Sequence, residues 1–177
     1  TRLIDDLLDV ERINRGLIEL QPADVDVAQL VDEAVEASRP LIDQRGHELR
    51  VALPDVPLRL HADAVRLEQV LCNLLHNAAK YTPPGGHIEL RACRVGTELR
   101  LSVRDDGIGM SAEDVPRVFE MYAQGDAAPR LAGVRDGLGI GLALAQRLVT
   151  LHGGRIEAHS AGPGRGSECG SRASGEH

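Results

Sequence analysis

The spacing of apolar residues predicts a chain of alternating helices and strands. At about 100° per residue, the stretch from Arg66 to Thr82 has an apolar side and a polar side. The apolar side carries Leu67, Val70, Leu71, Leu74 and Ala78. We expect this side to enter the core, with Asp63 capping the start of the helix.

The same patterns predict the other elements. Helical spacing is found over residues 1–14, 27–44 and 142–152. Strands are expected over residues 16–20, 47–53, 87–95, 98–104 and 154–160, with a turn at 21–26. Pro40 is expected to bend or interrupt the helix at 27–44, because an interior proline removes a backbone hydrogen bond.

The polar side of the central helix has an unusual composition for this chain. It carries Arg66, Gln69, Asn73, Asn77 and Lys80, whereas solvated faces elsewhere are mostly Arg, Asp and Glu. Carboxamides and an amine one turn apart suit a metal and phosphate site. Lys80 is also the only lysine, and a compact ammonium at a helix end suggests a point contact to phosphate. Chance placement is the competing interpretation.

Two glycine-rich segments add candidate chemistry. The predicted hairpin of residues 87–104 delivers Asp105 at a strand end, followed by Gly107 and Gly109, whose backbone can approach a flat ligand closely. Residues 137–141 open the last helix, where free backbone N–H groups and the helix dipole favour an anion. The loop between these segments is long, which is typical of a functional or mobile segment.

Composition and charge narrow the class of protein. The formal net charge of −7 argues against a nucleic-acid binder, which would carry a basic patch or stripe. The chain has no apolar run of membrane-spanning length and no signal-peptide pattern, which predicts a soluble chain. The cysteines lack CxxC spacing and the histidines are scattered singly. Their placement disfavours zinc sites and disulfide frameworks and favours a reducing cytoplasm.

Three motifs, in order, resemble the ATP-binding catalytic domain of sensor histidine kinases, which is part of the GHKL group. Residues 73–82 (NLLHNAAKYT) resemble the N box, residues 105–109 (DDGIG) the first glycine box, and residues 137–142 (GLGIGL) the second. The resemblance implies an α+β two-layer sandwich. Its sheet would be mixed, mostly antiparallel and covered on one face by helices, with a flexible ATP lid within residues 110–136.

The resemblance also implies roles for matched residues. Asp105 would accept a hydrogen bond from the adenine amine, Asn77 would bind Mg²⁺ through its side-chain oxygen, and Lys80 would contact phosphate. Tyr81 would line the adenine pocket, and Asn73 stands where hydrolytic relatives carry a glutamate that activates water. Asn73, Asn77 and Lys80 are the expected catalytic residues. The remaining nucleotide-binding positions are Gly107, Gly109, Gly137, Leu138, Gly139, Gly141, Leu142 and Ser167.

Domain boundaries follow from the same resemblance. Residues 1–15 resemble the end of the second dimerisation helix, whose apolar stripe would then be exposed, although an ordinary amphipathic helix fits equally. Residues 16–168 form the expected catalytic domain. Residues 169–177 (CGSRASGEH) show no strand pattern where relatives have a final apolar strand, so we expect an irregular tail.

One decoy lies at His47–Arg50. The sequence HELR mimics a phosphoacceptor box, in which the histidine sits on a dimerisation helix. Gly46 before it and the prolines after it predict a strand instead, so we reject His47 as the acceptor.

The predicted function is transfer of the ATP γ-phosphate to a histidine on a dimerisation domain outside the chain. The parent would be a homodimer that relays the phosphate to a response-regulator receiver domain, with this part in the cytoplasm; a membrane-anchored parent is compatible. A hydrolytic GHKL ATPase is one rival, disfavoured because the neutral carboxamide of Asn73 is a poor general base. The other rival is a non-catalytic nucleotide-binding scaffold, which the unusual C-terminus leaves open.

Overall fold

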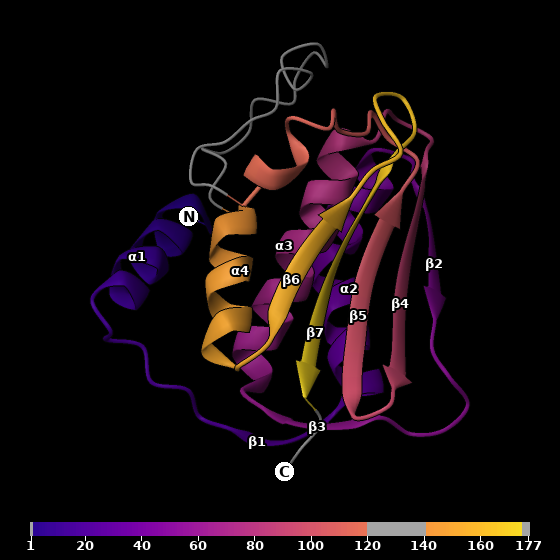
Figure 1. The fold of residues 1–177 in the computed structure, drawn as a ribbon. Helices are drawn as coiled ribbons and strands as arrows, with labels where there is room; N and C mark the ends of the chain where they lie inside the picture. Colours follow the sequence, from indigo (N-terminus) through magenta and orange to yellow (C-terminus); the bar gives the residue numbers. More distant parts are fainter. Residues whose placement is uncertain (1, 120–140, 175–177) are drawn as a thin grey trace.

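The computed structural model describes residues 2–119 and 141–174, in which helices lie against a sheet (Figure 1). In chain order the elements are α1 (Arg2–Asn14), β1 (Ala23–Asp26), α2 (Val27–Gln44), β2 (Glu48–Ala52), β3 (Arg59–Ala62), α3 (Ala64–Tyr81), β4 (His87–Val95), β5 (Glu98–Asp105), the 3₁₀ turn η1 (Val115–Arg117), α4 (Gly141–Leu151), β6 (Arg155–His159) and β7 (Ser167–Ser174). None of these helices is long and apolar enough to cross a bilayer.

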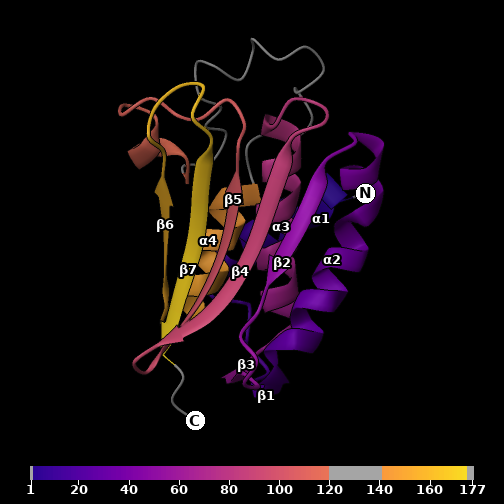
Figure 2. The ribbon, with the colours of Figure 1, turned by 90° about the vertical axis from the view of Figure 1, so that its right-hand side faces the viewer.

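The main sheet has five strands in the order β2-β4-β5-β7-β6. Only β2 and β4 are parallel; the other neighbours are antiparallel. Strands β1 and β3 form a separate antiparallel pair. Helices α2, α3 and α4 cover one face of the main sheet, as the side view shows (Figure 2). The predicted α+β sandwich with helices on one face is confirmed.

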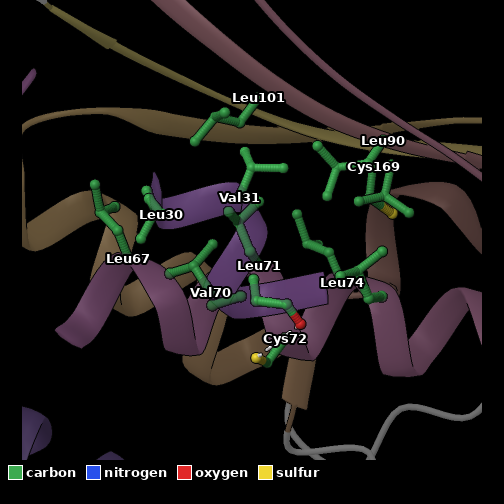
Figure 3. Packing of buried hydrophobic residues seen from close by; sticks show 14 of the residues in the cluster. Leu30, Val31, Leu67, Val70, Leu71, Cys72, Leu74, Leu90, Leu101 and Cys169 are labelled. Atoms are coloured by element: carbon green, nitrogen blue, oxygen red, sulfur yellow. Dashed lines mark hydrogen bonds between the residues drawn. The ribbon is translucent and has the colours of Figure 1, made fainter. Parts of the chain in front are cut away.

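The core lies between the helices and the covered face of the sheet (Figure 3). Alternate residues of β4 and β5 point into it because successive strand side chains face opposite ways. Leu71 and Leu74 of α3 meet this layer, together with Val31 of α2. The buried apolar residues of the main sheet are Ile88, Leu90, Ala92, Leu99, Leu101, Val103, Ile156, Ala158 and Cys169. Period-two alternation in the strands and helical spacing in α2 and α3 therefore build one continuous core.

Helix boundaries follow from local capping. Asp26 precedes α2 and its side chain accepts from the Ala28 amide, while Asp63 precedes α3 and accepts from the Arg66 amide. The predicted cap at Asp63 is confirmed. Pro40 lies inside α2, which continues through it to Gln44; of the two predicted effects, an interruption is absent and a bend stays a prediction.

Two predictions near the N-terminus were wrong. Residues 16–20 form no strand, and β1 instead begins at Ala23, inside the segment expected to be a turn. Strand β1 exists because it pairs with β3, from Ala23 opposite Ala62 to Asp26 opposite Arg59. This pairing is a long-range contact that the local pattern of residues 16–26 cannot show.

The irregular tail expected at residues 169–177 was also wrong for its described part. Residues through Ser174 form β7, which lies between β5 and β6 and pairs with both. Cys169 and Ser171 are buried against the helices, while Glu168 and Arg172 lie on the opposite face. The physical reason is that two neighbouring strands supply hydrogen bonds to the backbone, which overrides the weak strand propensity of Gly and Ser.

Helix α1 packs beside α4, at the far side from β2 (Figure 1). Val10 is buried, and the Asp9 carboxylate accepts a 2.9 Å hydrogen bond from Gln69 and lies 3.4 Å from Arg66. The same helix leaves Ile4, Leu7 and Leu8 exposed. The expected exposed apolar stripe is therefore present.

Candidate functional site

The candidate site forms where the end of α3 meets the turn after β5. Both lie at the upper end of the molecule in Figure 1, beside the loop between β6 and β7. The backbone N–H of Ile108 donates a 3.1 Å hydrogen bond to the carbonyl of Tyr81. This bond joins the first glycine box to the last turn of the N box, so the two motifs are brought together.

Glycines at the turn are required by close backbone approach. A Cβ at Gly107 would collide with the carbonyl oxygen of Tyr81 and come within 2.9 Å of both Asp105 Oδ1 and Thr82 Oγ1. Gly109 has φ +69°, and a Cβ there would collide with the carbonyl oxygen of Gly162. Because Gly107 and Gly109 have no side chains, the backbone at Tyr81 and Gly162 can pack directly against the turn.

Asp105 is buried at the end of β5 and its carboxylate is held on both oxygens. Its Oδ1 accepts from the Gly107 amide at 2.9 Å, and its Oδ2 accepts from the Ser167 hydroxyl at 2.9 Å. Burial raises the pKa of Asp105, although these hydrogen bonds act in the opposite direction. A carboxylate can accept about four hydrogen bonds, so acceptor capacity remains for a ligand amine.

The loop of residues 160–166 closes over the glycine turn. Gly164 donates to the carbonyl of Ile108 at 2.6 Å, and Gly166 donates to that of Gly107 at 3.0 Å. Ser160 accepts from the Met110 amide at 2.9 Å and donates to the Gly166 carbonyl at 2.6 Å. Ser167 follows this loop at the start of β7, which is why it reaches Asp105 although 62 positions separate them in the sequence.

The polar side of α3 divides into three parts. Its N-terminal part, Arg66 and Gln69, contacts Asp9 of α1. Its middle part, Asn73, is buried beside Gly141, where a Cβ would lie 3.8 Å from the Asn73 carboxamide carbon. The C-terminal part contains Asn77, Lys80 and Tyr81, all half-buried. Only this last part lies next to the glycine turn.

The start of α4 approaches the site through its first residues. Gly141 begins the helix against Asn73, and Leu142 packs partly buried against the core. The predicted positions Gly137, Leu138 and Gly139 lie outside the described residues, as does most of the expected lid. The structure therefore places Gly141 and Leu142 near α3 and leaves the rest of the second glycine box undescribed.

Three residues near the site were given no role by the sequence. Arg45 and His47 contact carbonyl groups at the end of α3. Thr82 is fully buried, and its Oγ1 has no hydrogen-bond partner among the described residues. The HELR tetrapeptide marked His47 only as a decoy; its last three residues lie in β2, which confirms the predicted strand.

The donor set fits a nucleotide with a hard cation. Asp105 offers a buried carboxylate with acceptor capacity left for a ligand, and burial raises the pKa of the Tyr81 phenol at the end of α3. Asn77 supplies a carboxamide oxygen, the type of ligand Mg²⁺ accepts when phosphates and water complete its shell. Lys80 supplies one cation on the same helix turn. The residues present therefore suit a purine at Asp105 and Tyr81, with a metal and phosphates at Asn77 and Lys80 of α3.

The chain is similar in sequence to one protein family and to sensor proteins within it. The family profile described as "Histidine kinase-, DNA gyrase B-, and HSP90-like ATPase" matches residues 62–172. The chain is 34% identical to the alginate biosynthesis sensor protein KinB of Pseudomonas aeruginosa over 93% of this chain and 27% of that protein. It is 34% identical to the signal transduction histidine-protein kinase BaeS of Escherichia coli over 90% of this chain and 34% of that protein. The chain thus spans roughly a third or less of these relatives.

Solved structures agree in fold. Full-length ShkA in complex with AMPPNP superposes with a TM-score of 0.83 at 32% identity, covering 97% of this chain and 35% of that one. The catalytic domain of histidine kinase ThkA superposes with a TM-score of 0.75 at 22% identity, covering 88% of this chain and 98% of that one. The second likeness, at its low identity, supports the fold alone.

Proposed function

This chain is a member of the histidine kinase-, DNA gyrase B- and HSP90-like ATPase family, and we propose that it is the ATP-binding catalytic domain of a sensor histidine kinase. In this proposal it holds ATP with Mg²⁺ and directs the γ-phosphate to a histidine on a dimerisation domain outside the chain. The observation that carries the proposal is the bond between Ile108 and Tyr81, which sets the buried carboxylate of Asp105 beside the carboxamide and lysine end of α3.

Each residue has a role that its chemistry allows. The carboxylate of Asp105 accepts from the adenine amine, with Ser167 and the Gly107 amide fixing its orientation. Asn77 is the protein ligand of Mg²⁺, and Lys80 contacts phosphate. Bound Mg²⁺ would supply charge neutralisation on the phosphates. Gly141 at the start of α4 lies against Asn73 of α3, and the free N–H groups of a helix start favour an anion such as phosphate.

Asn73 separates the proposal from a hydrolytic ATPase. It is buried between α3 and α4, where a general base would need a carboxylate or imidazole to take a proton from water. A carboxamide does not accept that proton near neutral pH. Transfer to an external histidine is therefore favoured over hydrolysis.

The parent protein supplies the remaining parts of the proposal. We assign residues 1–15 to the end of the second dimerisation helix, because α1 buries Val10 but leaves Ile4, Leu7 and Leu8 exposed. The exposed side chains suit a neighbouring helix of a homodimer. The phosphate acceptor after the histidine would be a response-regulator receiver domain, and the catalytic part would lie in the cytoplasm.

Calorimetric titration of the chain with ATP, with and without Mg²⁺, tests the proposal. The wild-type chain should bind Mg-ATP, and Asn77→Ala should remove the effect of Mg²⁺ while leaving weaker metal-free binding. Asn14→Ala, at the distant end of α1, serves as a matched control that should bind normally. Binding that ignores both Mg²⁺ and Asn77→Ala would refute the metal assignment, and absence of any ATP binding would refute the whole proposal.

A further inference from the structure

The C-terminal end of α3 lacks the usual means of capping. The last carbonyl groups of a helix have no partner within it, and the N–H groups of the two residues after the cap commonly satisfy them. Here the cap is Thr82, in an extended conformation, and the next two residues are Pro83 and Pro84. Proline has no N–H group, so the helix cannot be closed by its own chain.

Donors from residues 45–47, between α2 and β2, replace the missing N–H groups. The His47 ring nitrogen Nε2 lies 2.9 Å from the Ala79 carbonyl oxygen, and it must carry the proton because a carbonyl can only accept. The Arg45 guanidinium donates from Nη2 to the carbonyls of Thr82 at 3.1 Å and Lys80 at 3.4 Å. A cation at this end also opposes the negative end of the helix dipole.

The fourth carbonyl of this end is satisfied by the glycine turn. Tyr81 accepts from the Ile108 amide, so every carbonyl from residue 79 to residue 82 has a donor from outside the helix. Two of the three donor groups come from one short segment, Arg45–His47. The end of α3 is therefore held between the segment Arg45–His47 on one side and the glycine turn on the other.

The donor segment is itself fixed by backbone bonds. The Gly85 amide donates to the Arg45 carbonyl at 3.0 Å, and the Glu48 amide donates to the Gly86 carbonyl at 2.9 Å. The His47 side chain is buried, so water cannot readily replace its bond to Ala79. This part of the chain can therefore hold the last turn of α3 in one position.

We propose that Arg45 and His47 are positioning residues for the nucleotide. They contact neither ATP nor metal, but act through the Ala79, Lys80 and Thr82 carbonyls to set where the side chains of Lys80 and Tyr81 point. This inference rests on the proposed nucleotide site at the end of α3. It also gives the HELR histidine a role other than phosphate acceptor.

The experiment compares disruptive and conservative variants at both positions. Arg45→Gln removes the charge and the fork of donors, whereas Arg45→Lys keeps a cation. His47→Leu removes the donor at similar size, whereas His47→Gln keeps a terminal N–H that can reach Ala79. Val149→Ala, in the last turns of α4, is a matched control for lost stability because Val149 is buried away from this end of α3. Dissociation constants for Mg-ATP and thermal melting are measured for each chain.

Wild type and Val149→Ala should bind Mg-ATP alike although the control melts lower. Arg45→Gln and His47→Leu should each raise the dissociation constant by about tenfold. This change corresponds to the free energy of about one buried hydrogen bond. His47→Gln should return to within about twofold of wild type, and Arg45→Lys should fall between. Unchanged affinity in both disruptive variants, with melting lowered, would show a merely structural role and overturn the proposal.

A second measurement does not depend on nucleotide. Hydrogen exchange at the Ile108 amide reports whether the end of α3 still presents the Tyr81 carbonyl. It should accelerate in Arg45→Gln and His47→Leu and not in Val149→Ala. If wild type fails to bind Mg-ATP, the proposed function fails and this exchange still decides whether Arg45 and His47 hold the helix end. If a disruptive variant does not fold, the comparison of wild type with Arg45→Lys and His47→Gln decides the affinity question.

Discussion

The hydroxyl of Ser167 donates a 2.9 Å hydrogen bond to the carboxylate of Asp105, joining the start of β7 to the end of β5. The register places these two residues directly opposite each other on neighbouring antiparallel strands. The proposed adenine-binding group is therefore oriented by the C-terminal strand of the domain. Any change that displaces β7 should affect nucleotide binding as well as stability.

Asp105→Asn should separate binding from stability. A carboxamide of the same shape presents a different pattern of donors and acceptors to adenine, so affinity for ATP should fall by about tenfold or more. Wild type should also prefer ATP over GTP, because a carboxylate would face the carbonyl oxygen of guanine. Titrations with both nucleotides check this, with Ser102→Ala on the opposite face of β5 as control. Equal affinity of wild type for ATP and GTP would contradict the assigned role.

The pKa of Asp105 gives this substitution a pH signature. Burial raises the pKa in the folded state above its ordinary value, so the folded chain binds this proton more tightly than the unfolded chain. The contribution of this group to the free energy of unfolding is then largest below the unfolded pKa and declines as pH rises through the folded one. As the pH rises across this window, denaturant unfolding should show that Asp105→Asn gains stability relative to wild type. A gain on lowering the pH instead would contradict the sign.

The local elements of this fold could be predicted because their patterns are local. Period-two alternation gave β4 with its observed ends, and helical spacing gave α2 with its observed ends. Strand β7 could not be predicted, because Gly170 and Ser171 have weak strand propensity and are held by β5 and β6 on either side. Strand β1 was missed for the same reason, since its partner β3 lies far along the chain.

The candidate site divides in a similar way. Asn77, Lys80 and Asp105 could be named because each lies within a contiguous motif. Arg45 and His47 could not, since their contacts with α3 span 32 to 37 sequence positions and depend on how β2 lies beside the helix end. The two prolines after Thr82 were the available signal: a helix ending before Pro-Pro needs donors from elsewhere.

The isolated chain should not phosphorylate itself on His47. Its side chain is buried, with Nε2 bonded to the Ala79 carbonyl and Nδ1 also buried, so neither nitrogen is open to an incoming phosphoryl group. Incubation with labelled ATP and Mg²⁺, followed by phosphosite mapping, checks this. Adding a separate dimerisation domain with an acceptor histidine provides the positive control. Acid-labile label on His47 of the isolated chain would refute the prediction.

Thiol reactivity should distinguish the three cysteines. Cys93 is half-buried on the open side of β4, whereas Cys72 and Cys169 are buried. Burial raises the pKa of Cys169 to about 12, which leaves almost no reactive thiolate at neutral pH. A chromogenic disulfide reagent should therefore label one thiol quickly in the folded chain and all three after denaturation. Cys93→Ser should abolish the fast phase; a fast phase that survives this substitution would show that Cys72 or Cys169 is accessible in the folded chain.

The last prediction concerns β7 itself. A chain ending at Glu168 should lose cooperative folding. The truncation removes most of β7, the strand that pairs with β5 on one side and β6 on the other. The loss uncovers Leu101, Val103 and Ile156, and each buried aliphatic side chain contributes about 1.5 to 3 kcal/mol. Unpaired backbone groups on both flanking strands add to the cost. The sum is a large share of a typical stability of about 5 to 15 kcal/mol.

A chain ending at Ser174 is the matched control, since it removes only the three residues after β7. Thermal melting is monitored by circular dichroism. This control should show the same cooperative transition as the full chain, and the chain ending at Glu168 should show no cooperative transition. Mg-ATP should raise the melting temperature of the full chain and the control, because ligand binding to the folded state stabilises it by mass action. A cooperative, ATP-responsive transition in the chain ending at Glu168 would mean that β5 and β6 can hold the site without β7, and that Ser167 alone suffices to orient Asp105.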